Sequence, residues 1–502
     1  YRSSRGLGDV YKRQTEYRGV PFARAPLGEL RFKAPQPLPD SGAEQTADHY
    51  PMPSLQMKNP VMGIQESSED CLYLNIWVPD GEGPFPVMVW FHGGGYLAGS
   101  VSQVLYNGAE LARSQNVVVV NAAYRLGAMG FADFSAVALE LDADTNLGMR
   151  DQLAALQWVQ ENIGAFAGDC GQVTLFGESA GGFSVGALLA CPQAKDLFHS
   201  AITQSGAADF VLAPDQVRKV TDAFVEALPG AGSAAEKLAS ADNKSWIKAQ
   251  NAAVKVLVDR GLRTTTPQFA MNFLPMVDGD LLPALPIEAI AAGAAADKRL
   301  LAGVCRDEFH FFQYAGVLAG TTTMDALKQI DDDEILRRFE RCVPGNGARA
   351  LDYYQTTVTP DSRRSRLDFL SAMESDRLFR VPTVRLLDAQ SRHNAQCWGF
   401  QFTWQSAPFG VPLGACHVVD VPFVFGVTDT PAGMYFTGGT DEARALSRQV
   451  QDAWGAFARG DSPGWDGWQS DRQVCQLGPG EPRAALLDEA GERLWQAIIP
   501  AV

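Results

Sequence analysis

The feature that most constrains this chain is a serine in a glycine-flanked turn between an apolar strand and an apolar helix. The turn is the pentapeptide GESAG at residues 177–181, with Ser179 at its centre. A short apolar run at 173–176 precedes it, and an apolar stretch through residue 190 follows it. This order is the setting of a nucleophile elbow, which exposes a serine hydroxyl at the carboxyl end of a sheet. The alternative is a structural Gly-Ser turn, and the flanking strand and helix favour the elbow.

A second glycine-rich motif follows another predicted strand. His92 and three consecutive glycines come directly after the apolar run at 86–91. Consecutive glycines let the backbone approach a substrate and point N–H groups at a developing oxyanion. Together with the N–H of Ala180, this segment would form an oxyanion hole. The alternative is a flexible glycine turn. His92 itself is expected to be a structural hydrogen-bonding group, not a base.

A nucleophilic serine needs a base, and in this kind of fold the chain order is Ser, then Asp or Glu, then His. His417 follows the strand expected at 398–404, which is where the base belongs. The other histidines after the serine fit less well: His199 comes too early, His310 too close to its nearest carboxylates, and His393 at the wrong end of the sheet.

The base in turn needs an orienting acid. Asp307 and Glu308 both follow the strand expected at 299–304, so both are candidates. Asp420, three residues after His417, is a weaker one. The pattern of residues leaves the choice between Asp307 and Glu308 open.

Strands alternate with helices along the chain, which predicts an α/β fold with a largely parallel sheet. Short β-branched or apolar runs predict strands at 72–78, 86–91, 117–121, 173–176, 201–204, 299–304 and 398–404. Apolar residues recur at helical spacing over 149–163. Segments 210–265 and 320–395 are richer in charge and helix formers and are expected to form helical insertions over one end of the sheet. No Pro/Ser-rich linker divides the chain, so residues 15–502 are expected to form one large domain.

Composition excludes several functional classes. Lys and Arg number 42 against 58 Asp and Glu, so the net charge is −16. Such a chain repels phosphate backbones and anionic membrane surfaces, so nucleic-acid binding is not expected. No run approaches the ~18 apolar residues of a transmembrane segment. The eight cysteines are scattered, without a CxxC or a Cys/His cluster, which predicts free thiols and no metal site or redox dithiol.

The first residues are set apart from the fold. The segment 1–14 (YRSSRGLGDVYKRQ) has neither helical nor strand periodicity, nor the apolar centre of a signal peptide. It resembles the translated adapter sequence found at the edges of assembled environmental DNA, and the alternative is a genuine polar tail. On the first interpretation the chain is a metagenomic sequence whose own N-terminus, with any signal peptide, has been replaced.

Seven motifs in order resemble the type-B carboxylesterases of the α/β-hydrolase superfamily, especially the bacterial para-nitrobenzyl-esterase-like members. The resemblance begins near residue 18 and runs almost to the C-terminus. Its motifs are RGVPFARAPLGELRF at 18–32, SEDCLYLNIWVP at 68–79, FHGGGYLAGS at 91–100, NLGMRDQLAALQWVQENI at 146–163, VTLFGESAGG at 173–182, RDEF at 306–309 and LGACHVVDVPFVFG at 413–426. The resemblance implies an α/β-hydrolase fold: a central, mostly parallel mixed sheet with helices on both faces and helical insertions over the active site.

The resemblance also implies roles for individual residues in the hydrolysis of a carboxylic ester to acid and alcohol. Ser179 would be the nucleophile and His417 the general base, with Glu308 as the orienting acid because the family's acid is the second residue of its Asp-Glu pair. Gly94, Gly95 and Ala180 would supply the oxyanion N–H groups. Three further residues match positions around the triad, with a structural role as the alternative for each: Glu178, Ser205 and Asp420.

The predicted partner is a small-molecule ester, the predicted state a monomer or weak homo-oligomer, and no cofactor or metal is expected. Secreted relatives pair the cysteine at position 71 with an upstream cysteine; this chain has none, which favours a cytoplasmic bacterial enzyme. No Trp precedes Trp77, so choline esters are not expected. The alternatives are an amidase, a carbamate hydrolase, a polyester or toxin esterase on the same triad, or a non-catalytic cholinesterase-like binding domain. Phe309, Phe311 and Phe312 are expected to line an apolar pocket or, for at least two of them, to pack in the core.

Overall fold

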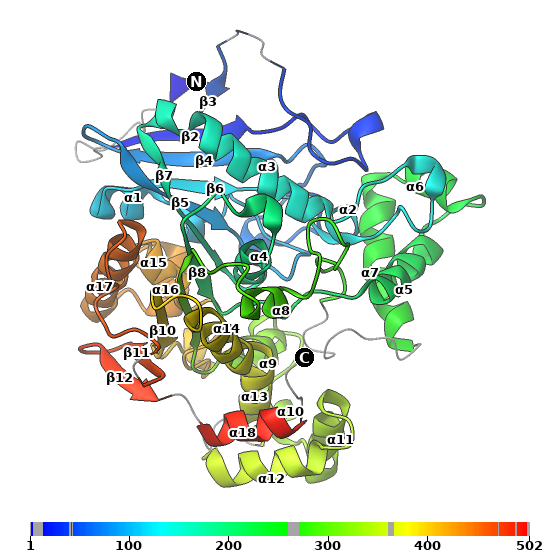
Figure 1. Cartoon of the computed structure of the whole chain (residues 1–502). Coiled ribbons are helices and arrows are strands. Elements are labelled where there is room, and N and C mark those ends of the chain that lie inside the picture. The colour runs from blue at the N-terminus through cyan, green and yellow to red at the C-terminus, as the bar shows by residue number, and fades with distance from the viewer. Residues whose placement is uncertain are drawn as a thin grey trace.

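A ten-stranded sheet organises the part of the chain that the computed structural model describes (Figure 1). The described residues are 2–3, 14–39, 42, 44–259, 271–359, 366–469, 471–486 and 489–498. The strand order is β12-β11-β10-β9-β8-β7-β5-β6-β4-β2. Neighbouring strands from β6 to β11 pair in parallel, whereas β2, β4 and β12 pair antiparallel at the two edges. This is the mixed, mostly parallel sheet that the sequence predicts.

The strands are β2 (Gln14–Pro21), β4 (Tyr73–Pro79), β5 (Phe85–Phe91), β6 (Val118–Ala122), β7 (Gly168–Glu178), β8 (Ser200–Gln204), β9 (Arg299–Cys305), β10 (Cys397–Phe402), β11 (Gln473–Leu477) and β12 (Arg483–Leu486). Two further short strands, β1 (Arg2–Ser3) and β3 (Thr46–Ala47), pair with each other outside this sheet.

The helices that cover the sheet are α1 (Ala109–Gln115), α2 (Gly127–Phe131), α3 (Leu147–Asn162), α4 (Ala180–Leu189), α8 (Pro286–Ala291), α14 (Val381–Ser391), α15 (Val421–Val424), α16 (Pro431–Thr437) and α17 (Asp441–Ala458). The first insertion carries α5 (Pro214–Ala227), α6 (Ala234–Ser240) and α7 (Asn243–Asp259). The second carries α10 (Met324–Lys328), α11 (Asp332–Cys342), α12 (Gly347–Thr357) and α13 (Leu367–Ser375). Helix α9 (His310–Leu318) precedes it, and the C-terminal helix is α18 (Glu489–Ile498).

Alternate residues of the central strands point into two different cores, one on each face of the sheet. In β5, Val87 and Val89 belong to a core shared with α3 and α4, whereas Met88 and Trp90 belong to a core shared with α1 and α17. Side chains of a strand alternate between faces, and strands covered on both faces are apolar throughout. That is why these strands appear in the sequence as continuous apolar runs.

The predicted elements are found close to their expected bounds, and helices do fill both insertions. Residues 260–265 of the first predicted insertion and 360–365 of the second lie outside the described residues. Strands β2, β11 and β12 were not predicted. β2 and β12 are the edge strands and β11 lies next to β12, and all three carry partly exposed side chains, so they lack the continuous apolar runs that mark the central strands.

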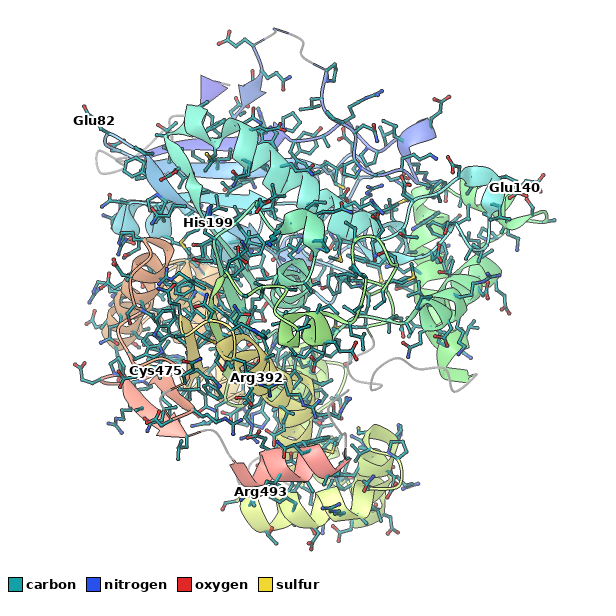
Figure 2. The ribbon with its side chains drawn as sticks, in the orientation of Figure 1. Glu82, Glu140, His199, Arg392, Cys475 and Arg493 are labelled. Atoms are coloured by element: carbon teal, nitrogen blue, oxygen red, sulfur yellow. The ribbon has the colours of Figure 1, made fainter. Side chains whose placement is uncertain are left out.

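The predicted extension 1–14 falls mostly on residues that are not described. Residue 1 and residues 4–13 lie outside the described part of the chain, whereas Arg2–Ser3 form β1 and Gln14 begins β2. Charged side chains such as those of Glu82, Glu140 and Arg493 lie at the periphery of the molecule (Figure 2).

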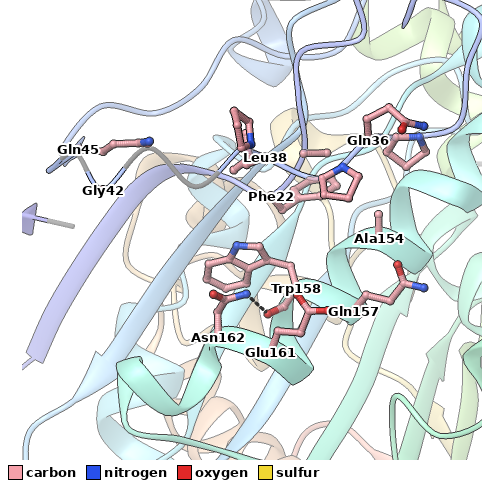
Figure 3. Close-up of a pocket in the computed structure, with 14 residues that line it drawn as sticks. Phe22, Gln36, Leu38, Gly42, Gln45, Ala154, Gln157, Trp158, Glu161 and Asn162 are labelled. Atoms are coloured by element: carbon pink, nitrogen blue, oxygen red, sulfur yellow. Dashed lines mark hydrogen bonds between the residues drawn. The ribbon is translucent and has the colours of Figure 1, made fainter.

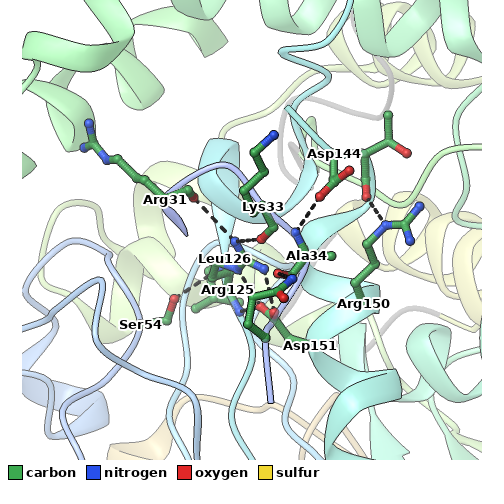
Figure 4. Close-up of polar contacts among 11 residues, drawn as sticks. Arg31, Lys33, Ala34, Ser54, Arg125, Leu126, Asp144, Arg150 and Asp151 are labelled. Atoms are coloured by element: carbon green, nitrogen blue, oxygen red, sulfur yellow. Dashed lines mark hydrogen bonds and ion pairs between the residues drawn. The ribbon is translucent and has the colours of Figure 1, made fainter. Parts of the chain in front are cut away.

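A buried ion pair fastens the N-terminal segment to the helices beside the sheet (Figure 4). The guanidinium of Arg125 donates to both carboxylate oxygens of Asp151 in α3, at 2.7 and 2.8 Å. It also donates to the carbonyl of Lys33, at 2.9 Å. The two side chains are 1% and 0% exposed. Such a pair is strongly destabilising to break, because removing one partner leaves the other charge buried and uncompensated.

We therefore expect Asp151→Ala to lower the free energy of unfolding by about 3–5 kcal/mol. Chemical denaturation followed by circular dichroism measures the change. The control is Asp142→Asn, which neutralises an exposed carboxylate paired with Lys33, keeps a residue that tolerates the left-handed backbone at this position and should leave the unfolding midpoint unchanged. Equal midpoints for Asp151→Ala and the parent protein would contradict the structural role of the pair.

Candidate functional site

The predicted site residues follow the carboxyl ends of adjacent strands of the sheet. Ser179 directly follows β7, and the glycine run at 93–95 follows β5. Glu308 follows β9, and His417 lies on the loop after β10. The carboxyl edge of a parallel sheet is where α/β folds bind ligands. The sheet order thus gathers residues that lie far apart in the sequence.

The backbone of Ser179 adopts the strained conformation of an elbow, with φ 56° and ψ −123°. The glycines beside it are required by close packing: a Cβ on Gly181 would lie 1.8 Å from the carbonyl oxygen of Phe91. A Cβ on Gly177 would lie 2.5 Å from the backbone of Gly181. The N–H of Ser179 donates to the carbonyl of Gln204 in β8, at 2.9 Å. The elbow is therefore locked between β5, β8 and the start of α4.

The glycine run after β5 packs directly against the elbow. A Cβ on Gly93 would lie 2.7 Å from Glu178 Oε2 and 3.0 Å from Ser179 Cβ. Gly94 and Gly95 have φ of +111° and +64°, values that L side chains rarely adopt. Among the described residues, the N–H groups of Gly94, Gly95 and Ala180 have no hydrogen-bond acceptor, so three donors near Ser179 are available to a bound group.

His417 is held by Glu308. Its Nδ1 lies 2.6 Å from Glu308 Oε2, and its backbone N–H donates to the carbonyl of Glu308 at 3.2 Å. The other carboxylate oxygen, Oε1, accepts the N–H of Cys305 at 2.7 Å. Both side chains are almost wholly buried. The imidazole is thereby fixed in one orientation with Nε2 directed away from the acid.

Asp307, the alternative acid, has a different contact. Its Oδ2 accepts the N–H of Ala415 at 2.8 Å and is paired with Arg306. It thereby holds the backbone of the loop that carries His417, but Glu308 is the residue that touches the imidazole. Asp420, the third candidate, accepts a hydrogen bond from Gln204 at 2.7 Å.

Glu178 lies on the other side of the imidazole from Glu308. Its Oε1 is 3.1 Å from His417 Nε2. Burial raises the pKa of Glu178 to about 8, although the charge on His417 opposes this shift. Burial alone would lower the pKa of His417, but the carboxylates of Glu178 and Glu308 outweigh it and raise the pKa to about 9. The three groups therefore form one coupled buried unit.

The serine and the imidazole are not hydrogen-bonded to each other here. Within the described part of the chain, His417 Nε2 makes no hydrogen bond, and its contact with Glu178 is an ion pair. Hydrogen bonds of catalytic groups are often long or misaligned without substrate and tighten in the complex. The structure thus brings the side chains of Glu308 and Glu178 into contact with His417. Ser179 is the residue that follows Glu178 in the sequence.

Ser205 and Asp420 lie behind the site. Ser205 is fully buried with φ 49°, and its hydroxyl is 3.9 Å from the sulfur of Cys305, whose backbone holds Glu308. Burial raises the pKa of Asp420 to about 6. Its partner Gln204 also accepts the indole N–H of Trp454 at 3.2 Å. The side-chain hydrogen bonds of Ser205 and Asp420 go to Cys305 and Gln204, not to the imidazole of His417.

The other histidines make backbone contacts away from the imidazole of His417. His92 Nδ1 lies 2.8 Å from the carbonyl of Gly93, and burial lowers its pKa to about 4, which fits the predicted structural role. His199 lies on the loop before β8 and bonds the backbone of Val173 (Figure 2). His310 contacts the carbonyl of Leu413, and His393 that of Ala291.

Aromatic rings pack around the imidazole of His417. The ring centroids of Phe312 and Phe379 lie 5.0 and 4.9 Å from that of His417, and Phe311 lies 6.4 Å away. Phe309 is fully buried in the core. Two of the three predicted phenylalanines therefore face the site. Phe379 was missed, because it lies in the second insertion with no motif around it.

A cavity of about 440 Å³ lies elsewhere, between the segment after β2 and α3 (Figure 3). Phe22, Trp158 and three prolines line it, and none of its lining residues is a serine, histidine or cysteine. No group of His, Cys, Asp or Glu side chains among the described residues is arranged to hold a metal ion. All eight cysteines are described and unpaired. The described helices include none that is both long and apolar enough to span a bilayer.

Comparisons with known proteins show what the chain is similar to. The sequence model of the carboxylesterase family matches residues 6–477. The chain is 37% identical over 455 residues to a para-nitrobenzyl esterase of Bacillus subtilis, covering 89% of this chain and 86% of that protein. It is 34% identical to a cholinesterase of Mus musculus, covering 89% and 75%. A solved structure described as a PNB esterase superposes with a TM-score of 0.81 at 32% identity, covering 98% of this chain and 97% of that one.

The charge arrangement predicts how His417 titrates. We expect its pKa to lie well above that of buried His92, and Glu178→Gln to lower it, because removing a neighbouring negative charge disfavours the imidazolium. NMR of the ¹⁵N-labelled histidines from pH ~5 to ~10 follows the titration of His417 in the parent and the variant, while His92 stays neutral across this range. Asp429→Asn, which neutralises an exposed carboxylate paired with Arg444, is the control and should leave His417 unshifted. An unchanged or higher pKa in Glu178→Gln would contradict the coupling.

Proposed function

This chain belongs to the carboxylesterase family and hydrolyses carboxylic esters, and we propose that its reaction runs through Ser179, His417 and Glu308. The observation that carries the proposal is the 2.6 Å contact between His417 Nδ1 and Glu308 Oε2, beside the elbow that holds Ser179. An acid bonded to Nδ1 fixes the tautomer in which Nε2 is free to take a proton. Ser179, the strained residue of the elbow, is the nucleophile.

The reaction proceeds in two halves. Ser179 attacks the ester carbonyl while His417 takes the hydroxyl proton, and the N–H groups of Gly94, Gly95 and Ala180 stabilise the oxyanion. The tetrahedral intermediate collapses as His417 donates the proton to the leaving alcohol. Water, deprotonated by His417, then attacks the acyl-enzyme and releases the acid. Glu308 stabilises the imidazolium in both halves.

We assign Glu178, Ser205 and Asp420 to the surroundings of the triad. Glu178 lies next to Nε2, where its charge controls how strongly His417 holds a proton. Ser205 supports the strand end that carries Glu308, through Cys305. Asp420 ties the segment after His417 to β8 through Gln204.

The substrate is a small-molecule ester, and we propose that it is one with an apolar group next to the reacting carbonyl. Aromatic rings stand against His417, whereas no Trp precedes Trp77 to hold a choline cation. Amides, carbamates and polyesters are the further substrates that the same triad could accept. We further propose that residues 15–502 act as one domain, monomeric or weakly homo-oligomeric.

The primary test is hydrolysis of para-nitrophenyl butyrate by the parent protein and by Ser179→Ala. We expect the variant to lose kcat by about 10⁶-fold, leaving only the residual rate of the oxyanion donors and the binding site. Matched circular dichroism spectra establish that both proteins are folded. Equal rates would show that the activity does not arise at Ser179.

A second comparison separates the two neighbouring acids. Glu308→Gln should lower kcat by about 10⁴-fold, because an amide at this position favours the wrong tautomer of His417. Asp307→Asn keeps an oxygen for the Ala415 N–H and should lower kcat far less. A larger loss in Asp307→Asn than in Glu308→Gln would reverse the assignment of the acid.

A further inference from the structure

The ring closest to His417 is carried by a turn of π-helix in the second insertion. Phe379 lies in the π-helical segment Asp376–Arg380, where the N–H of Val381 donates to the carbonyl of Asp376, five residues earlier. Pro382, which follows, has no N–H to offer a regular helix. Phe379 is fully buried, and its ring centroid is 4.9 Å from that of His417. Single π-turns are frequent at functional sites.

Phe379 completes an aromatic wall that reaches the helix of the nucleophile. Its ring stacks on Phe312 at 6.3 Å and on Phe183 at 6.4 Å. Phe183 lies in α4 and donates its N–H to the carbonyl of Ser179. Phe210 packs on Phe183 at 4.2 Å. The wall therefore flanks both the helix that begins after Ser179 and His417, and on the proposed mechanism an acyl group attached to Ser179 would lie beside it.

A buried hydrogen-bonded chain connects this π-turn to the C-terminal helix. The indole N–H of Trp495 in α18 donates to the hydroxyl of Tyr354 in α12, at 2.9 Å. That hydroxyl donates to Oδ2 of Asp376, the first residue of the π-turn, at 2.6 Å. Arg380, the last residue of the turn, donates to Oδ1 of the same carboxylate at 2.7 Å.

This series of hydrogen bonds is shielded from water. Trp495 is 1% exposed and Tyr354 2% exposed. Both pack in a satellite core formed by α11, α12, α13 and α18, which lies at one end of the molecule (Figure 1). In low dielectric, each bond of such a network is strengthened, and a partner left unpaired is costly. The position of the π-turn is thereby coupled to helices remote from Ser179.

We propose that Tyr354 and Trp495 are positioning residues that set the acyl-chain preference, by holding the π-turn so that Phe379 limits the space beside Ser179 and His417. The inference rests on the proposed function, because it takes Ser179 as the residue that carries the acyl group. Loosening the turn lets the Phe379 ring withdraw, so longer acyl chains are accepted. Short chains do not reach the wall and are hydrolysed as before.

The test measures kcat and KM for para-nitrophenyl acetate, butyrate and octanoate, which share one leaving group. In Tyr354→Phe, we expect kcat/KM for octanoate relative to acetate to rise several-fold, up to about tenfold, mainly through a lower KM, since the lost hydrogen bonds are individually modest. Trp495→Phe should change the ratio in the same direction by less. Tyr353→Phe, at the neighbouring position in α12 and outside the hydrogen-bonded chain, is the matched control.

A double-mutant cycle distinguishes positioning from general destabilisation. Phe379→Ala should raise the octanoate-to-acetate ratio by itself, and adding Tyr354→Phe to it should change the ratio no further. A ratio that is unchanged in both Tyr354→Phe and Trp495→Phe, with the Phe379→Ala ratio raised, would overturn the proposal. The proposal would also be overturned if Tyr354→Phe raised the octanoate-to-acetate ratio in the Phe379→Ala background as much as it does in the parent protein.

The failure of the proposed function gives a different result. If Ser179→Ala still hydrolysed the acetate, the activity would arise at another site. The proposed function would then be wrong, and the octanoate-to-acetate ratio would not test Tyr354 and Trp495. If Ser179→Ala is inactive but Tyr354→Phe and Trp495→Phe keep the parent ratio, the proposed function stands and only the role of Tyr354 and Trp495 is lost. Should Tyr354→Phe fail to fold, Trp495→Phe, which keeps an aromatic ring in the core, decides the question.

Discussion

Close packing of glycines around Ser179 is the constraint on which the site depends. The serine keeps a positive φ only because the surrounding backbone determines it from several sides. Gly181 lies against the end of β5, Gly93 against Glu178 and Ser179, and the N–H of Ser179 is bonded to β8. A side chain at either glycine would push the strand ends apart. The elbow, the glycine run and the order of the central strands are therefore one structural unit.

The second organising element is the gathering of buried carboxylates around one imidazole. Glu308 and Glu178 lie on opposite sides of His417, and Asp420 lies close enough to raise its pKa further. Burial disfavours the charges of Glu178 and Asp420, and pairing with the imidazolium offsets this cost. The same field would favour the imidazolium that forms as a serine is deprotonated. The arrangement therefore favours the imidazolium form of His417 over the neutral imidazole.

The sequence was sufficient for the parts of the fold whose signals are local. Central strands such as β5 and β6 are buried on both faces, so their continuous apolar runs were visible, and Ser179 and the glycine run after β5 follow such runs directly. The choice between Asp307 and Glu308 was different. The two are adjacent and chemically equivalent in the sequence, and only the path of the loop from Leu413 to His417 decides which side chain meets the imidazole.

Other features had no local signal at all. The edge strands β2 and β12 are partly exposed and lack apolar runs. The contact between Glu178 and His417 depends on how the end of β7 meets the loop after β10. Phe379 reaches the imidazole from a part of the second insertion that carries none of the motifs. Contacts of this kind are set by tertiary packing. A sequence pattern indicates which face of its own helix or strand a residue occupies. It does not indicate which other helix, strand or loop will pack against that face.

The residues proposed to carry out the reaction and the residues proposed to set the acyl-chain preference therefore lie in different parts of the fold. The groups proposed to react follow the ends of central strands, where packing on both faces leaves little freedom. The ring nearest to His417 stands instead on a π-turn whose anchors, Tyr354 and Trp495, belong to a separate satellite core. A change in that core can move the wall without touching β5, β7 or β9. Insertions packed in this way allow the accepted ester to change while the geometry around Ser179 is kept.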